Sequence, residues 1–128
     1  MLKIKKLFLA LTIVLISASP VWAENWVRVA TKANLFVDTD SIRKASGFVY
    51  YWQITNYLEP LHGDLSSKIY IKLNCDSLGY MYLKIETYDS HMGKGKLTSS
   101  FTPEPKWDYF ASGSPGDIIA KQVCKWAK

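Results

Sequence analysis

Three consecutive segments of the chain alternate apolar and polar side chains, and this pattern constrains the fold more than any other feature. They are Gly47–Leu58, Leu65–Cys75 and Gly79–Tyr88. A period of two predicts strands that bury one face. The connections between them, at Glu59–Asp64 and Asp76–Leu78, are short, so consecutive strands are expected to pair antiparallel. The sequence therefore predicts a single antiparallel β-sheet.

Shorter elements complete this sheet and add one helix. Ser114 is of a type that caps helix N-termini, Pro115 suits the first helical position, and apolar residues recur at helical spacing to about Lys125. The predicted fold class is mainly β (α+β), with about six strands and a C-terminal α-helix packed on one face. Further short strands are expected at Trp26–Ala30, Leu35–Asp38, Leu97–Phe101 and Trp107–Phe110, and one helical turn at Ser41–Lys44.

The alternation also predicts which side chains face the helix, because the apolar sets of neighbouring strands must share one face. On the first long strand we assign the even positions to the core, which places Trp52 opposite Ile71 and Leu83. The other face then presents tyrosines and lysines, which suit a protein interface or a dimer contact but also a solvated sheet surface. The predicted core set is Phe48, Tyr50, Trp52, Ile54, Leu65, Ile69, Ile71, Leu73, Met81, Leu83 and Ile85. The candidate binding face is Tyr51, Tyr57, Lys68, Tyr70, Lys72, Tyr82, Lys84 and Tyr88.

The first 23 residues have the organisation of a secretory signal peptide. Three lysines in Met1–Lys6 precede the apolar run Leu7–Ala18, and small residues precede a cut between Ala23 and Glu24. The run is shorter than the roughly 20 apolar residues that span a bilayer, and an uncleaved N-terminal anchor is the alternative. Cleavage leaves residues 24–128 as one exported domain without a membrane span. The residue directly after the cut is Glu24 and not cysteine, which argues against a lipid-anchored lipoprotein.

The two cysteines of the chain are expected to form one disulfide. An even number of cysteines in an oxidising compartment is typical of a structural bridge. Cys75 ends the predicted core face, and Cys124 shares an apolar helical stripe with Ile119 and Val123, so a bridge would clamp the helix onto the sheet. The alternatives are metal ligation and thiol catalysis, but neither cysteine belongs to a C-x-x-C pair or has a histidine nearby in the sequence.

The charge and composition of the chain argue against nucleic-acid binding and against catalysis. Of the 16 basic residues three lie in the signal, which leaves 13 against 11 acidic ones, without the concentrated basic stripe of a nucleic-acid binder. The two histidines, His62 and His91, lie in predicted loops without the partners of a catalytic triad. We expect a non-enzymatic protein with no catalytic residue, no metal and no cofactor, and no nucleic-acid partner. A candidate binding loop is formed by His91, Met92, Lys94 and Lys96.

Several short motifs occur in a characteristic order. They are Trp26-Val27-Arg28-Val29, Leu35–Arg43 with its Asp-x-x-Ser-Ile-Arg-like end, Ser66-Ser67-Lys68, Asn74-Cys75, the Met92–Gly95 loop, Trp107, Ser114 and Val123-Cys124. In this order and spacing the chain resembles the surface-adhesin protein E family of exported proteobacterial proteins. The resemblance implies an antiparallel sheet with a helix and a disulfide. It also implies a periplasmic or extracellular, cell-surface location in a Gram-negative bacterium and, for the naming member, adhesion to matrix proteins such as vitronectin and laminin.

Two functions from different classes follow. The first is an exported, adhesin-like binding protein that recognises a host matrix or envelope protein. The alternative is a periplasmic inhibitor of an enzyme such as lysozyme, because Ser46–Tyr50 is loosely like the S-G-x-x-Y segment of one lysozyme-inhibitor family. A homodimer is also expected, because a small sheet leaves an edge or face that favours pairing. A dimeric mass in light scattering at tens of micromolar would support it, and a monomeric mass would refute it.

Overall fold

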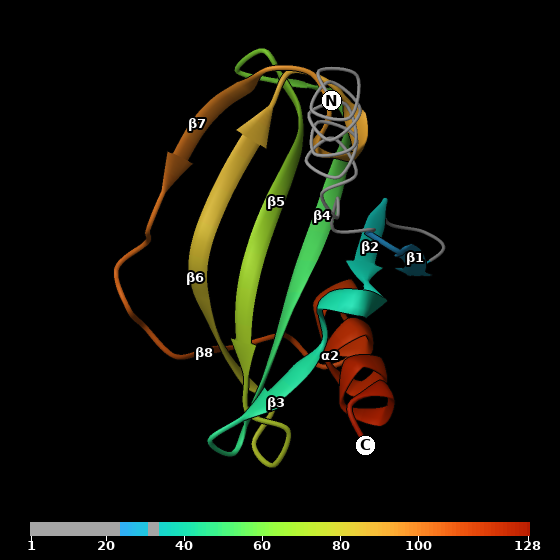
Figure 1. Cartoon of the computed structure of the whole chain (residues 1–128), viewed down its shortest axis with the longest axis vertical. Coiled ribbons are helices and arrows are strands. Elements are labelled where there is room, and N and C mark those ends of the chain that lie inside the picture. Colours follow the sequence, from blue (N-terminus) through green and yellow to red (C-terminus); the bar gives the residue numbers. More distant parts are fainter. Residues whose placement is uncertain (1–23, 31–33) are drawn as a thin grey trace, which may run out of the picture.

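The computed structural model describes residues 24–30 and 34–128, and within them a twisted antiparallel sheet carries one C-terminal helix (Figure 1). The predicted signal peptide, including Ala23, lies outside the described residues. The strands of the described part are β1 Trp26–Ala30, β2 Leu35–Asp38, β3 Arg43–Ala45, β4 Phe48–Leu61, β5 Asp64–Leu73, β6 Gly79–Tyr88, β7 Leu97–Phe101 and β8 Asp108–Tyr109. The helical elements are the 3-10 turns η1 Thr39–Ser41 and η2 His91–Gly93 and the α-helix α2 Pro115–Trp126.

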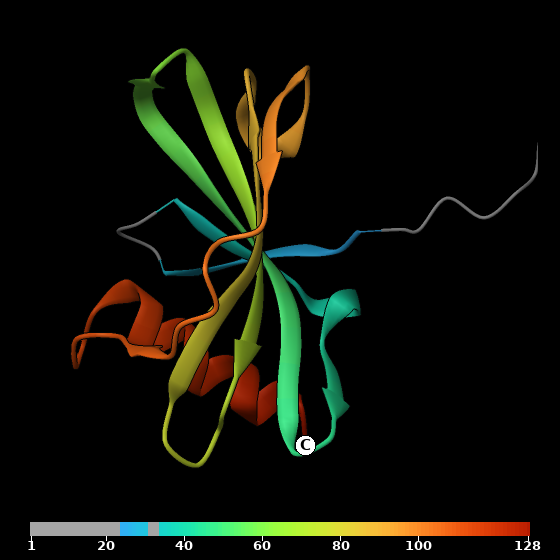
Figure 2. The same cartoon turned by 90° about the vertical axis from the view of Figure 1, so that its left-hand side faces the viewer.

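The strand order confirms the predicted fold class. The main path across the described sheet is β1-β2-β4-β5-β6-β7, with β3 paired to β4 and β8 paired to β6. Every pairing is antiparallel. Figure 2 shows α2 beside one end of the sheet, while the β4–β5 hairpin and the β6–β7 connection project together at the other end. Helix α2 and the β4–β5 hairpin therefore lie at opposite ends of the sheet.

The expected helical turn at Ser41–Lys44 is wrong in its position. Asp38 caps a shorter turn, η1, by accepting a hydrogen bond from the backbone N–H of Asp40, and the chain then enters strand β3. A two-residue turn with positive φ at Ser46 (52°) and Gly47 (83°) returns β3 onto β4. Positive φ at both central residues matches the twist of a β-hairpin, which is why the sequence forms a strand pair here rather than a helix.

Helix α2 begins as predicted and closes the core. The Ser114 hydroxyl accepts the backbone N–H of Asp117, and Pro115 occupies the first turn. The carboxylate of Asp117 accepts hydrogen bonds from the Gly113 N–H and the Lys121 ammonium, which lowers the pKa of that carboxyl. The buried core between the helix and the sheet comprises Val37, Val49, Tyr51, Ile71, Leu73, Ile119, Ala120 and Val123.

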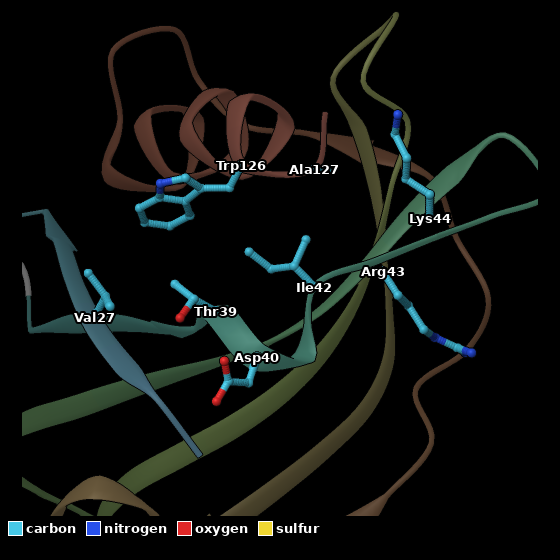
Figure 3. A pocket seen from close by; sticks show the side chains of 8 residues that line it. All are labelled: Val27, Thr39, Asp40, Ile42, Arg43, Lys44, Trp126 and Ala127. Carbon is cyan, nitrogen blue, oxygen red and sulfur yellow. The ribbon is translucent and has the colours of Figure 1, made fainter. Parts of the chain in front are cut away.

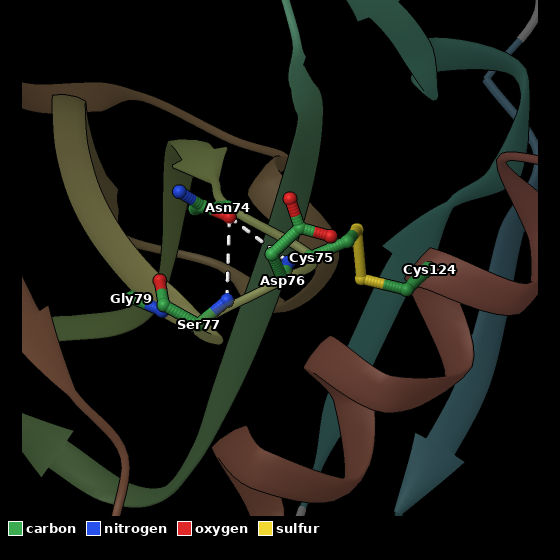
Figure 4. Close-up of a disulfide and its surroundings, with 6 residues drawn as sticks. All are labelled: Asn74, Cys75, Asp76, Ser77, Gly79 and Cys124. Carbon is green, nitrogen blue, oxygen red and sulfur yellow. Dashed lines mark hydrogen bonds between the residues drawn. A yellow bond between two sulfur atoms is a disulfide. The ribbon is translucent and has the colours of Figure 1, made fainter.

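The predicted disulfide between Cys75 and Cys124 is confirmed (Figure 4). Their Cα atoms lie 5.8 Å apart, so the bridge fixes the last turns of α2 to the end of β5. The loop that follows Cys75 is held by the Asn74 carboxamide oxygen, which accepts the backbone N–H groups of Asp76 (2.9 Å) and Ser77 (3.3 Å). This turn reverses the chain into β6, so the disulfide is anchored on a rigid hairpin.

The predicted register of the first long strand is wrong. In β4, Tyr51 pairs with Ile71 and Val49 pairs with Leu73, so the odd positions of β4 face α2. The even positions that were assigned to the core lie on the opposite face, where Trp52 pairs with Tyr70. The physical reason is that both faces of β4 carry apolar side chains, and the larger aromatic ones lie on the face away from the helix.

In β6 the predicted faces are correct for one half and wrong for the other. Tyr70 pairs with Lys84 while Ile71 pairs with Tyr82, so Leu83 is an extra residue that forms a β-bulge. Beyond the bulge, the pairings of Ile69 with Ile85 and of Lys68 with Glu86 are as predicted. Before the bulge the faces are exchanged: Tyr80 and Tyr82 pack against the core, and Met81 pairs with Lys72.

Candidate binding face

Aromatic and cationic side chains gather on the sheet face opposite α2, and we name this surface the aromatic–cationic face. The even positions of β4 form its centre, and β1, β3 and β5 contribute neighbouring side chains. One further tryptophan comes from the segment before β8. The members are Trp26, Arg43, Phe48, Tyr50, Trp52, Lys68, Tyr70, Lys72 and Trp107.

At one end of the face a lysine lies between two tryptophans. The ammonium of Lys68 is 5.7 Å from the ring centre of Trp26 and 5.3 Å from that of Trp52. The carboxylate of Glu24 lies 3.2 Å from this ammonium and accepts the indole N–H of Trp26 at 2.7 Å. These side chains line a groove with a volume of about 430 Å³. The charge of Lys68 is therefore neutralised within the protein.

In the middle of the face the phenol of Tyr70 packs between two aromatic rings. Its ring centre lies 4.9 Å from that of Trp52 and 6.1 Å from that of Tyr50. The guanidinium of Arg43 lies 5.2 Å from the Tyr50 ring centre, and its Nε donates a hydrogen bond to the Tyr70 hydroxyl at 3.3 Å. Arg43 is exposed but is held in one orientation by these two contacts.

At the other end of the face Lys72 lies against two further rings. Its ammonium is 4.2 Å from the ring centre of Phe48 and 5.6 Å from that of Trp107. The two rings stack with their centres 5.6 Å apart. Cation–π contacts of this length hold the ammonium over the aromatic surface.

Five of the eight residues of the predicted binding face lie on the sheet face away from α2, and three of these five belong to the aromatic–cationic face. Lys68, Tyr70, Lys72, Lys84 and Tyr88 lie on the sheet face away from α2, as predicted. Two members lie on the helix side instead, which corrects the predicted face: Tyr51 is buried in the core, and Tyr82 is half-buried and packs against it. Tyr57 is half-buried further along β4.

The surroundings of these two phenols raise the pKa of both. Tyr51 is 0% exposed, and burial, with the neighbouring phenol of Tyr82, raises its pKa. Burial and the neighbouring Tyr80 raise the pKa of Tyr82 to about 12. Desolvation of the charged form is the main cause in both cases, which agrees with the packing of both side chains at the core.

Sequence reasoning missed six members of the face. Four of the aromatic ones were visible in the alternation of β4 or in the β1 motif but were given no surface role. Arg43 was missed because strand β3 was not expected, and Trp107 because its stacking partner belongs to a distant strand. The missed residues are Trp26, Arg43, Phe48, Tyr50, Trp52 and Trp107.

The candidate loop is docked onto the sheet by its first half. The backbone N–H of Met92 donates to the Asn56 carboxamide at 2.7 Å, and Nε2 of His91 is hydrogen-bonded to the Tyr57 carbonyl at 2.9 Å. Gly93 has a φ of 63° and donates its N–H to the Ser66 hydroxyl. A Cβ at Gly93 would clash with the Lys68 side chain, so the loop requires glycine there. The remaining members, Lys94 and Lys96, are exposed.

A second hollow of about 600 Å³ lies on the other side of η1 and β3 (Figure 3). The side chains of Ile42 and Trp126 border it, whereas that of Arg43 points away. The alternation of β3 therefore directs Arg43 to the aromatic–cationic face.

Among residues 24–30 and 34–128 no three His, Cys, Asp or Glu side chains gather as a metal site would need. In the same ranges, no helix has the length and apolar character to span a membrane.

The fold defines a small antiparallel-sheet domain with one disulfide-linked C-terminal helix. The chain belongs to the surface-adhesin protein E family, whose model matches residues 26–125. This confirms the resemblance carried by the sequence motifs, and the family is one of surface adhesins rather than of enzymes. No curated protein sequence matches the chain significantly.

Solved structures of protein E from Haemophilus influenzae share the fold. The protein E structure from non-typeable Haemophilus influenzae has a TM-score of 0.63 at 18% identity, covering 81% of this chain and 76% of that chain. Crystal form II of Haemophilus influenzae protein E gives a TM-score of 0.66 at 19% identity, covering 84% and 94%. The selenomethionine form gives 0.68 at 17% identity, covering 84% and 90%. At these identities the likeness establishes the fold.

Proposed function

We propose that the protein is an exported, non-enzymatic, adhesin-like binding protein that recognises a protein partner through its aromatic–cationic face. The observation that carries this proposal is the gathering of tryptophan, tyrosine and arginine on the one sheet face that α2 leaves uncovered. These residue types supply most of the binding energy at protein interfaces. Host matrix glycoproteins and envelope proteins are the partner classes that membership of the adhesin family supports.

The packing of the face supports binding because it fixes the contacting side chains in advance. Tyr70 is held between Trp52 and Tyr50, and Arg43 is held by a ring and a hydroxyl. Side chains that are already ordered lose less conformational entropy when a partner docks. Residues 24–128 form the proposed mature domain, and the Glu24 that would begin it contacts Lys68 within the face.

The test is capture of purified matrix glycoproteins and envelope fractions by immobilised mature protein. Trp52→Ala removes a ring from the centre of the face and is expected to weaken capture by about 30-fold, the effect of a typical interface hot spot. Trp126→Ala is the matched control, because that tryptophan is 40% exposed at the end of α2. Equal loss of capture in both variants, or in neither, would contradict the proposal.

Two other predictions stand beside this one. Homodimerisation fits the two outer strands of the sheet path, β1 and β7, each of which pairs on one side among the described strands.

The lysozyme-inhibitor alternative rested on Ser46–Tyr50, and the first two of these residues form the β3–β4 turn. The requirements of that turn account for the Ser-Gly pair without a binding role. Lys94 and Lys96, from the candidate loop, stay a secondary binding prediction.

A further inference from the structure

Two cations of the aromatic–cationic face have no acidic partner among the described residues. Lys68 is paired with Glu24, and Lys84 approaches Glu86 at 3.9 Å. Arg43 and Lys72, in contrast, form no ion pair within the described part of the chain. Each is held against aromatic rings instead. A cation that is fixed in position and not neutralised is a prepared site for an anion.

Each of the two cations lies beside a stacked pair of rings. Tyr50 and Tyr70 stack on one another, and Arg43 contacts the ring of the first and the hydroxyl of the second. Phe48 stacks on Trp107, and the Lys72 ammonium lies within 5.6 Å of both ring centres. The rings therefore hold the charged ends of both cations in place, and these ends can meet an anionic group while the rings contact the rest of the partner.

The sheet fixes the spacing of the two cations. Arg43 on β3 and Lys72 on β5 are both direct neighbours of Tyr50 on β4. Adjacent strands lie about 4.8 Å apart, so the Cα atoms of the two residues are separated by roughly 10 Å across the sheet. Two anionic groups on a partner can therefore engage both cations at once, one on each side of Tyr50.

We propose that Arg43 and Lys72 form a two-point receptor for carboxylates on an acidic segment of the protein partner. This inference rests on the proposed function and specifies the chemistry of the partner. The guanidinium of Arg43 uses its Nε for Tyr70, and its outer N–H groups form the planar fork that matches a carboxylate. Lys72 supplies a compact second charge. Because the receptor is at the surface, its attraction weakens as salt is added.

The probe for this receptor is a short glutamate-rich peptide, with the same peptide carrying glutamine as its neutral counterpart. Arg43→Gln and Lys72→Gln are each expected to weaken binding of the acidic peptide by about tenfold or more. Lys125→Gln removes the same charge from an exposed site on α2 and is expected to leave binding unchanged. Arg43→Lys retains the charge without the fork and is expected to give an intermediate loss. Thermal unfolding of each variant checks that the fold is intact.

Each outcome decides between the inference and its rivals. Equal binding of the acidic and neutral peptides, or unchanged binding in both glutamine variants, overturns the inference. Heparin binding that depends on Arg43 and Lys72, without binding of the peptide, assigns the receptor to an acidic polysaccharide instead. Loss of protein capture in Trp52→Ala without any peptide binding refutes the acidic receptor and leaves the proposed function standing. Unchanged capture in Trp52→Ala refutes the proposed function itself.

Discussion

Replacing Cys75 and Cys124 with serine lowers the free energy of unfolding by about 4 kcal/mol. The two residues are 49 positions apart, and the chain-entropy model gives this value for releasing a loop of that length in the unfolded state. For a domain of this size the loss corresponds to a fall in Tm of roughly 15–30 °C. It is the largest effect that we expect from any change outside the apolar core. Urea denaturation followed by far-UV circular dichroism measures it.

The reduced wild-type protein provides the matched control for the double-serine variant. Both lack the bridge, so their unfolding curves are expected to coincide, and a reductant should not alter the variant. A reductant that leaves the wild-type curve unchanged would show that the bridge contributes nothing to stability. In that case, the packing of Ile119, Ala120 and Val123 alone holds α2 on the sheet.

Replacing Tyr51 with alanine costs about 3–5 kcal/mol of unfolding free energy, the range for removing a buried aromatic side chain. Tyr51 is 0% exposed and packs between the sheet and α2. Tyr50, one residue earlier on β4, points to the opposite face and is half-buried. Tyr50→Ala removes its contacts with Tyr70 and Arg43 and is expected to cost about 1 kcal/mol.

The two variants together test the register of β4, because they exchange the same side chain for the same residue on opposite faces of one strand. The urea midpoint should fall far more for Tyr51→Ala than for Tyr50→Ala. The reverse order would restore the even positions of β4 to the helix side of the sheet. It would also remove Tyr50 and Trp52 from the aromatic–cationic face.

Local sequence patterns predicted the elements of this fold better than their faces. β1, β2, β6 and β7 have the predicted limits, since alternation and turn residues mark them directly. The face of β5 was also predicted correctly, because four of its five odd positions are aliphatic and its even positions are aspartate, serine, lysine and tyrosine. β4 offers no such contrast, since one side carries Phe48, Tyr50, Trp52 and Ile54 and the other carries Val49 and Tyr51.

The faces of β4 were predicted wrongly because the more hydrophobic set of side chains was assigned to the helix side. Ile54 is fully buried on the face away from α2, where it lies beside Gly93 of η2 and pairs with Lys68. Polar Gln53 is buried on the helix side. The bulge at Leu83 is a second feature that alternation does not reveal, because an extra residue exchanges the faces of every position before it.

For the candidate site, the sequence predicted the lysines and tyrosine of β5 but not their aromatic surroundings. The predicted face of tyrosines and lysines is in the structure a set of aromatic rings that hold three cations in place. That arrangement depends on contacts between β1, β3, β4, β5 and Trp107, which are distant in the sequence. Cation–π contacts have no sequence spacing of their own, so only the folded sheet reveals them.

Hydroxyl-radical footprinting of the mature protein, with and without a captured partner, tests the central claim most directly. The claim is that the sheet face opposite α2 is the one that meets the partner. The account predicts that oxidation of Tyr50, Trp52 and Tyr70 falls when the partner binds, while oxidation of Trp126 does not change. Protection of Trp126 or of the exposed Phe101 on β7, with the three face residues unchanged, would contradict it.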